Sequence, residues 1–341
     1  MSQPFDALLV VSFGGPEGMD EVMPFLENVL RGRHVPPARM REVARHYELF
    51  GGVSPINEQN RRLIGALERE LEAKGPRLPV YWGNRNWRPF LDDALRRMRD
   101  DRVANALAFV TSAYSSYSGC RQYREDIERA REAVGEGAPR VEKLRAFYNH
   151  PGFVGPNAEH VRAALAEIPA ERRPAARLAF TAHSIPAAMA AGCDYEAQLR
   201  ETCRLVAGAA GHESWRLVFQ SRSGPPTQPW LEPDIREHLR ELKREGARDV
   251  VVSPVGFISD HMEVLYDLDT EARQAAADLG LNLVRAATVG THPAFVSMIR
   301  ELILERLDAG TPRRALGTFA PRPDACPADC CLPGPTRPAT P

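Results

Sequence analysis

Three carboxylates stand four residues apart in the segment EVLYDLDTEAR. They are Glu263, Asp267 and Glu271, and on an α-helix they would share one face. Like charges at this spacing destabilise a helix by about 0.2–0.5 kcal/mol per pair, so the row is either a solvated acidic face, partly neutralised by Arg273, or a functional feature. As a functional row it offers hard oxygen ligands that could pass a divalent cation or carry protons away.

A histidine supplies a complementary group. His183 directly follows the apolar run RLAFTA, where an isolated histidine would most often be a hydrogen-bonded core residue. Five strand ends, this one included, carry polar or glycine-rich loops, which favours a shared cleft at one edge of a sheet. The His183 imidazole and the Glu263 carboxylate are a pair suited to a metal ion that keeps open coordination positions. This chemistry by itself names no substrate.

The elements that must position these groups alternate along the chain. Short apolar runs bounded by turn residues are separated by stretches of helical periodicity, which is typical of βαβ units and parallel sheets. The expected strands are residues 7–13, 79–83, 106–111, 141–148, 177–182, 216–220, 249–255 and 281–286. The expected helices are residues 19–30, 60–74, 90–98, 124–134, 158–165, 195–207, 233–245 and 295–307. Four strands in each half predict two doubly wound α/β domains with four-stranded parallel sheets.

Length and composition set the broad class. The 341 residues exceed what one hydrophobic core usually spans, and we expect an N-terminal domain at 1–150, a C-terminal domain at 151–310 and a cysteine-containing tail at 311–341. The formal net charge of −1 argues against nucleic acid as a partner. The first apolar run is far shorter than the roughly 20 residues of a membrane span and no basic segment precedes it, so we expect a cytoplasmic protein without membrane association.

The N-terminal third has features that suit anions. Arg33 can grip a carboxylate with two hydrogen bonds, and the segment GGVSPIN adds free backbone N–H groups with Ser54 and Asn57 as donors. Ser54 and Pro55 are also an ordinary start for a helix. Both interpretations can hold, because a helix N-terminus itself attracts anions.

Cysteines gather near the C-terminus. Cys326, Cys330 and Cys331 lie in the tail, and Cys120 follows the third expected strand. Four thiolates suit a zinc ion or a [2Fe–2S] cluster, whereas a disordered tail with free thiols is the alternative. Cys193 and Cys203 are expected to be small core residues.

Five motifs together resemble the ferrochelatases, which insert ferrous iron into a porphyrin. They read, in order, LLVVSFGGP, RHYELFGGVSPIN, TAHSIP, QSRSGP with PWLEPD, and PVGFISDHMEVLYDLD, and the match runs from about Ala7 to Leu307. The resemblance implies two Rossmann-like domains with a porphyrin cleft between them. It implies that His183 and Glu263 coordinate Fe²⁺ or accept the two pyrrole protons, and that Asp267 and Glu271 form a relay for metal or protons.

The resemblance also implies porphyrin contacts. Tyr47, Ser54 and Tyr123 match family positions that contact the macrocycle or its propionates. Phe13 stands where some bacterial members carry a tyrosine able to ligate iron, and phenylalanine has no donor atom. Iron is therefore expected to be held from the His183 side.

Two further departures concern propionate recognition. The family arginine before the RGR element is Leu30 here, and the basic residue before the tyrosine of RHYELFGG is His46. Propionate binding is therefore expected to depend on Arg31 or His46.

The substrate expected from the resemblance is coproporphyrin III. The motifs are most similar to actinobacterial-type coproporphyrin ferrochelatases, and the segment between Gly14 and Gly51 lacks the long apolar lip of membrane-associated members. An open polar cleft suits a porphyrin with four propionates. The same resemblance favours a [2Fe–2S] cluster on Cys120 and the three tail cysteines, a monomer, and contact with other enzymes of haem synthesis.

Alternatives within and beyond the class stay open at this point. A relative acting on protoporphyrin IX, or one inserting cobalt or nickel into a reduced tetrapyrrole, would share the fold. A porphyrin or haem carrier, or an iron–sulfur redox sensor, would not need both His183 and Glu263. Hydrolysis with Ser184 or Ser221 as nucleophile is least favoured, because the G-x-S-x-G elbow is missing.

Overall fold

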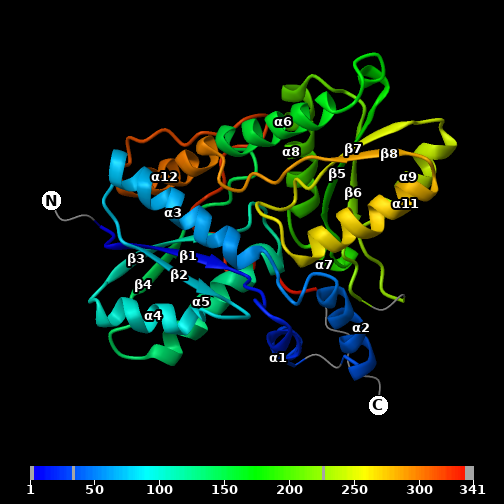
Figure 1. Cartoon of the computed structure of the whole chain (residues 1–341). Helices are drawn as coiled ribbons and strands as arrows, with labels where there is room; N and C mark the ends of the chain where they lie inside the picture. The colour runs from blue at the N-terminus through cyan, green and yellow to red at the C-terminus, as the bar shows by residue number, and fades with distance from the viewer. Residues whose placement is uncertain (1–3, 33–34, 225–226, 335–341) are drawn as a thin grey trace.

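Two parallel sheets organise the computed structural model, which describes residues 4–32, 35–224 and 227–334. The first sheet has the order β2-β1-β3-β4 and the second the order β6-β5-β7-β8, with all paired strands parallel. The strands are β1 (Ala7–Ser12), β2 (Val80–Asn84), β3 (Asn105–Val110), β4 (Arg140–Lys143), β5 (Arg177–His183), β6 (Trp215–Gln220), β7 (Asp249–Ser253) and β8 (Asn282–Arg285). One topology therefore occurs twice in the chain (Figure 1). The predicted strands and the α/β class are confirmed.

Only β4 differs markedly from its predicted length. The apolar run continues to Tyr148, but the strand ends at Lys143. Lys143 pairs with Ala108 of β3, so β4 ends before β3 reaches its last residue, Val110. Residues 144–150 are buried as an irregular segment instead. An apolar run shows burial, and periodicity alone does not separate a buried strand from a buried connection.

Helices cover both faces of each sheet. They are α1 (Met19–Val29), α2 (Pro37–Glu48), α3 (Ile56–Lys74), α4 (Leu91–Asp100), α5 (Gln122–Val134), α6 (Pro151–Ala166), α7 (Ala187–Ala191), α8 (Tyr195–Ala210), α9 (Ile235–Arg244), α10 (Met262–Val264), α11 (Arg273–Asp278) and α12 (Pro293–Leu307). Two π-helical segments, η1 (Tyr117–Arg121) and η3 (Leu265–Ala272), and a short 3₁₀ turn, η2 (Arg173–Ala175), complete the described elements.

Strand β1 shows why its sequence is continuously apolar. Leu8 and Val10 pack with α3, whereas Leu9 and Val11 pack with α4 and α5, and all four side chains are buried. Because both faces of the sheet are covered, every position of the strand favours an apolar residue.

One large core joins the two sheets. It contains Leu8 and Phe109 from the first sheet, Phe180 from the second, and Phe295 from α12. Helix α12 packs on both α3 and α6, and its Arg300 donates to the main-chain oxygen of Lys74 at 2.8 Å. The last helix therefore contacts both halves, and domain limits at residues 150 and 310 stay a prediction.

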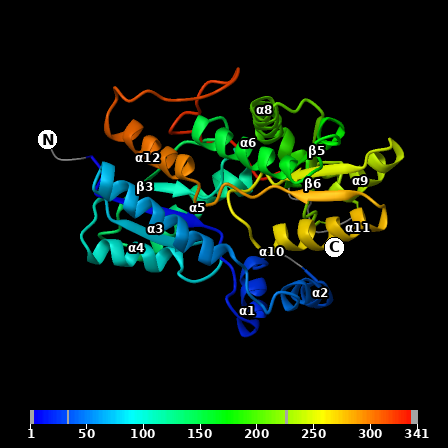
Figure 2. The same cartoon turned by 45° about the horizontal axis from the view of Figure 1, so that its top comes forward.

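Helices α1 and α2 project together from the body (Figures 1 and 2). Phe25, Tyr47 and Met262 form a separate apolar cluster there, so this pair touches the segment that follows β7. The sequence analysis did not predict α2, because its sequence PARMREVARHYE is rich in arginine and has few apolar residues. Proline at its first position starts the helix where a missing N–H costs nothing.

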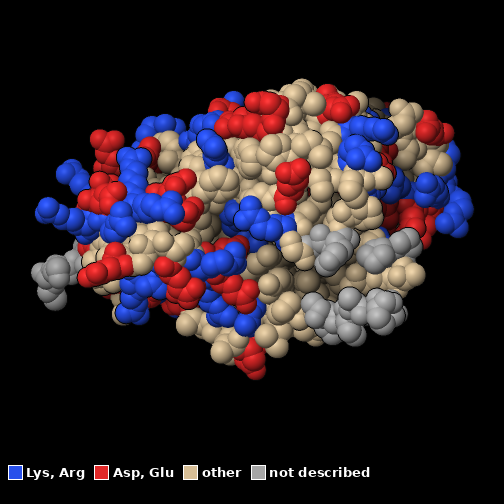
Figure 3. Space-filling view, turned by 90° about the horizontal axis from the view of Figure 1, so that it is seen from below, with Lys and Arg blue, Asp and Glu red and all other residues tan. Residues whose placement is uncertain are grey.

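The described part of the tail, residues 308–334, has no helix or strand but is fastened to the body. The main-chain N–H of Leu316 donates to the main-chain oxygen of Asn149 at 2.8 Å, and Cys331 is buried. Every helix in the described ranges is too short or too polar to cross a membrane. On the side of α1 and α2, positive and negative side chains are interspersed (Figure 3).

Candidate active site

His183 is the last residue of β5, where the strand order of the second sheet reverses direction between β5 and β7. Such a reversal opens a crevice at the carboxyl ends of the strands. The segment after β7 crosses close to β5, since the N–H of Gly256 donates to the main-chain oxygen of Thr181 at 2.9 Å. A Cβ on Gly256 would lie 2.6 Å from Ala182, so only glycine allows this approach. The approach brings the chain that carries Glu263 beside His183.

The His183 and Glu263 side chains face each other. Nε2 of His183 lies 3.6 Å from Oε2 of Glu263, and the two side chains are 32% and 51% exposed, so a solute can reach both. Nδ1 of His183 lies 2.5 Å from the main-chain oxygen of Ser184. Because a carbonyl oxygen can only accept, Nδ1 carries a proton in this contact, and Nε2 is the ring nitrogen that faces Glu263. The Tyr195 hydroxyl donates to the main-chain oxygen of His183 at 3.0 Å and steadies the end of the strand.

The acidic row lies on a π-helix. Glu263 belongs to α10, and Asp267 and Glu271 follow in η3, where hydrogen bonds join residues five apart. The predicted helix is present, but its geometry is not the α-helix on which the four-residue spacing was based. π-Helical segments are rare and often occur at functional sites.

Each acid of the row has a different partner. Asp267 accepts hydrogen bonds from the Ser221 hydroxyl and, at 3.3 Å, from Nε2 of Gln220. Glu271 forms an ion pair of 3.2 Å with Arg236 of α9. The sequence analysis proposed Arg273 as the neutralising cation, whereas Arg273 pairs with Asp269 at 3.6 Å. The long-range contact with Arg236 neutralises Glu271 instead.

Burial raises the pKa of Asp267 to about 7, with smaller contributions from the charges of Glu263 and Glu271, while the Ser221 hydrogen bond lowers it. The carboxyl therefore exchanges its proton near neutral pH. His261 is a further titratable group beside His183 and Glu263. Burial lowers the pKa of its imidazole, and the charges of Glu263 and His183 have smaller effects on it. A neutral His261 ring stacks edge-on against Phe257 with centroids 4.9 Å apart.

Sequence reasoning missed the roles of four residues near the acidic row. His261 was noted only within a strand-end motif, Ser221 only as a loop residue and an unfavoured nucleophile, and Gln220 and Arg236 were not singled out for this site. A sequence signal existed for two of them, since Gln220 ends the expected strand 216–220 and Ser221 follows it. Ser221 also has a positive φ of 62°, which is uncommon for serine and which no sequence pattern predicts.

Two of the predicted porphyrin contacts join this site from α2. Tyr47 is buried, and burial and the Glu263 charge raise the pKa of its hydroxyl, which stays protonated. The His46 ring stacks on Tyr266 of η3, with centroids 3.7 Å apart and planes 9° apart. Burial lowers the pKa of His46. Helix α2 therefore meets the π-helix through aromatic rings.

Phe13 is linked to these residues by a row of rings. Its centroid lies 6.3 Å from that of Phe25, which lies 6.1 Å from Tyr47. Phe13 is 37% exposed, and Met19 and Val53 are also exposed, the latter on a segment that forms a bridge with Glu17. The N-terminal segment, where the sequence predicts a polar cleft, thus carries exposed apolar side chains.

The remaining predicted contacts lie within the first half. Tyr123 is buried beneath Arg85, whose guanidinium is 4.4 Å from the ring centroid, and Ser54 is buried against Gly15. Arg31 is exposed in the turn after α1. Arg33 lies outside the described residues. Direct substrate contact by Ser54, Tyr123 or Arg31 stays a prediction.

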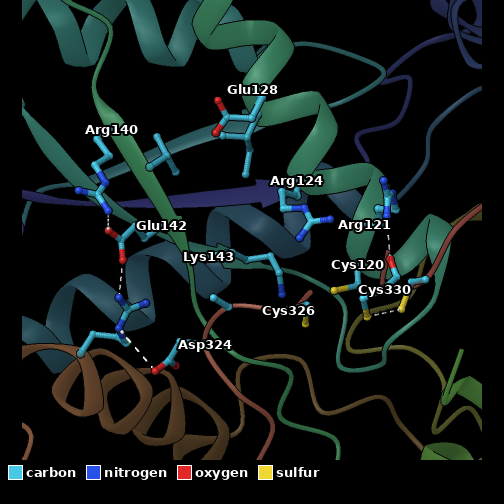
Figure 4. A pocket seen from close by; sticks show the side chains of 15 residues that line it. Cys120, Arg121, Arg124, Glu128, Arg140, Glu142, Lys143, Asp324, Cys326 and Cys330 are labelled. Atoms are coloured by element: carbon cyan, nitrogen blue, oxygen red, sulfur yellow. Dashed lines mark hydrogen bonds and ion pairs between the residues drawn. The ribbon is translucent and has the colours of Figure 1, made fainter. Parts of the chain in front are cut away.

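The four cysteines singled out from the sequence line one pocket of about 320 Å³ (Figure 4). The thiols of Cys120 and Cys326 are within hydrogen-bonding reach of each other, and the sulfur atoms of Cys330 and Cys331 are 3.3 Å apart. Arg121 fastens the tail here by donating to the main-chain oxygens of Ala328 at 2.6 Å and Cys330 at 3.0 Å. The fold therefore brings the internal cysteine and the three tail cysteines together.

The donor set is chemically suited to an iron–sulfur or zinc centre, because thiolates are the usual ligands of both. In the described ranges, however, no three His, Cys, Asp or Glu side chains stand in the arrangement of a metal site. Cys193, expected in the core, is half-buried and near enough for the charges of Cys330 and Cys120 to raise the pKa of its thiol, after the larger effect of burial.

The chain has a chelatase-like fold. A structure of SirB from Bacillus subtilis with Fe³⁺ is similar, with a TM-score of 0.51 at 13% identity, covering 89% of this chain and 99% of that one. A structure of the sirohydrochlorin chelatase SirB in complex with cobalt has a TM-score of 0.50 at 12% identity, covering 89% and 94% of the two chains.

Sequence comparison gives the family. The ferrochelatase family model matches residues 5–307, and the chain belongs to the ferrochelatase family. A ferrochelatase of Rhodopirellula baltica is 58% identical over 98% of this chain and 95% of the relative. Coproporphyrin III ferrochelatases of Streptomyces griseus and Nocardia farcinica are each 52% identical, over 98% and 96% of this chain and 96% and 97% of the relatives. The resemblance stated from the five motifs is thus confirmed.

Proposed function

We propose that this chain inserts Fe²⁺ into coproporphyrin III and releases two protons. The Streptomyces and Nocardia relatives, which match nearly end to end, are named for this activity, and family membership supports iron insertion into a porphyrin. The observation that carries the proposal is the exposed pair of His183 Nε2 and Glu263 Oε2, 3.6 Å apart at the switch point of a sheet.

The reaction exchanges two N–H bonds for bonds to iron. Fe²⁺ enters as the substrate, two pyrrole nitrogens lose their protons, and the metalloporphyrin is neutral at its centre. The lone pair on Nε2 of His183 and the carboxylate of Glu263 coordinate the incoming ion or accept these protons. The hydrogen bond from Nδ1 to Ser184 keeps the lone pair aimed at the site.

Asp267 and Glu271 provide a route by which protons leave His183 and Glu263. Asp267 exchanges a proton near neutral pH, so it can receive one from Glu263 and release it again. Glu271 is already paired with Arg236, which makes it a weaker ligand for a cation. The row is therefore better suited to protons than to iron.

The α2 side holds the macrocycle. Tyr47 and His46 present rings next to the acidic row, and Phe13 adds an exposed ring without a donor atom. Iron is therefore bound from the His183 side. Arg31 or His46 binds propionates, and Ser54 and Tyr123 contact the macrocycle or its propionates.

The pocket around Cys120 holds a [2Fe–2S] cluster on Cys120, Cys326, Cys330 and Cys331. The convergence of these four thiols supports this assignment. The cluster would supply one-electron redox chemistry at a place separate in the fold from the His183 pair. Transient contact with other enzymes of haem synthesis, a monomeric chain and a cytoplasmic location are further predictions of the sequence.

The test is anaerobic insertion of Fe²⁺ by the purified protein, with coproporphyrin III and protoporphyrin IX side by side. We expect loss of free porphyrin with coproporphyrin III at a much higher kcat/KM. Preference for protoporphyrin IX would refute the substrate assignment while keeping the reaction. Porphyrin binding without turnover of either compound would refute catalysis and favour a carrier.

A further inference from the structure

The pocket beside the cysteines carries more positive than negative side chains. Its basic members are Arg121, Arg124, Arg140, Lys143 and Arg306, and its acidic members are Glu128, Glu142 and Asp324. The sequence analysis assigned no role to any of them.

All three acidic groups already have basic partners. Glu142 pairs with Arg140 at 2.7 Å and also with Arg306. Asp324 pairs with Arg313 at 2.7 Å. Both of these carboxylates therefore already form ion pairs with arginine side chains.

The third acidic residue of the pocket, Glu128, and the basic residue Arg121 also have ion-pair partners. Glu128 pairs with Arg131 at 2.6 Å, and Arg121 pairs with Glu125 at 2.7 Å. Two cations of the pocket then have no carboxylate partner among the described residues: Arg124 and Lys143.

Both unmatched cations face the thiols. In Figure 4 the Arg124 guanidinium and the Lys143 amine project toward the space beside Cys120 and Cys326. The amine also donates to the main-chain oxygen of Leu144 at 3.1 Å and is within hydrogen-bonding reach of the Cys120 sulfur. Half-buried positive charges without a carboxylate partner favour an anion at this place.

We propose that Arg124 and Lys143 are the electrostatic partners of the cysteine-bound cluster and set its reduction potential. This inference rests on the proposed [2Fe–2S] cluster. Two ferric ions, two sulfides and four thiolates leave a net double negative charge, which two cations balance. An added electron makes the group more negative, so each nearby positive charge favours the reduced form and raises the potential.

The experiment measures the midpoint potential of the cluster in the full chain, by titration with dithionite followed by visible absorbance and electron paramagnetic resonance. Arg124→Gln and Lys143→Gln should each shift the potential to more negative values, and the double variant should shift it further. Arg124→Lys and Lys143→Arg keep the charge and should restore most of the potential. Arg140→Gln is the matched control, since that exposed cation already pairs with Glu142.

The outcomes separate this inference from the cluster assignment. Absence of iron, sulfide and visible absorbance in the unaltered chain would refute the cluster and this inference with it. A normal cluster whose potential is the same in Arg124→Gln, Lys143→Gln and the control would refute the inference alone. If the Gln variants fold but do not load a cluster, loading by the charge-keeping variants supports the inference, and failure of both types overturns it.

Discussion

The imidazole of His183, at the end of β5, and the carboxylate of Glu263, in the segment after β7, face each other. Nε2 lies 3.6 Å from Oε2, and Nδ1 contacts the main-chain oxygen of Ser184. Eighty residues of sequence separate the pair. Their geometry leaves a lone pair and a carboxylate at one exposed point, which suits a metal ion or a proton in transfer.

Removing the imidazole should stop insertion without preventing porphyrin binding. We expect His183→Ala to lower kcat about 10²–10⁴-fold, which is the usual contribution of a positioned acid or base. Anaerobic insertion assays measure the rate, and quenching of porphyrin fluorescence measures binding. His160→Ala, on helix α6, is the control and should keep normal turnover. A near-normal rate for His183→Ala would contradict the assignment of this pair.

The Ser221 hydrogen bond should set the pH at which Asp267 works. This bond lowers the pKa of Asp267, which lies at about 7, so Ser221→Ala should raise that pKa further. Because the ionised form accepts protons, the rising limb of the kcat profile should move to higher pH. Ser223→Ala, an exposed serine on the same loop, is the control. Superimposable profiles would argue against Asp267 as a proton acceptor.

The raised pKa of Asp267 should also affect stability. The ordinary pKa is 3.8 and the folded value about 7, so the folded state binds the proton more tightly than the unfolded state. The free energy of unfolding should therefore fall as pH rises between these values, through the contribution of this group. Asp267→Asn removes the effect, so its Tm relative to the unaltered protein should rise from pH 5 to pH 8. A constant difference across this range would contradict the raised pKa.

Loss of one tail thiol should remove the cluster. Cys326→Ser takes away a ligand that contacts Cys120, so the visible absorbance and acid-labile sulfide of the anaerobically purified protein should be lost. Cys193→Ser is the matched variant, because Cys193 lies near the group but outside the proposed ligand set. An unchanged spectrum in Cys326→Ser would contradict the assignment, and a spectrum lost only in Cys193→Ser would point to a different ligand set.

A buried ion pair anchors the start of the tail. The Arg145 and Glu305 side chains are each 1% exposed and form two hydrogen bonds, at 2.7 and 2.9 Å. Glu305→Ala leaves a buried guanidinium with one carboxylate fewer and should cost about 3–5 kcal/mol of unfolding free energy. Arg62→Ala, which breaks an exposed pair with Glu58, should cost less than about 1 kcal/mol. Equal effects in urea denaturation would contradict this difference.

The sequence by itself determined the alternating fold and the central pair. Buried parallel strands need continuous apolar runs and covering helices need an apolar stripe, so the eight strands and most of the long helices could be located from periodicity. His183 and the segment with Glu263 were visible because each follows such a run, and parallel strands end at one edge. The local hydrophobic pattern was therefore sufficient to predict both the fold and the two central residues.

The tertiary structure decided which side chains pair with the acidic residues of the site. Arg236, not Arg273, neutralises Glu271, and Ser221 with Gln220 holds Asp267, because these groups meet through packing of α9 and the end of β6 against η3. Sequence spacing reports neighbours along one helix, whereas these contacts cross from one element to another. The π-helical geometry of η3 and the seating of the tail cysteines against Cys120 likewise depend on contacts between distant segments, which local sequence patterns do not encode.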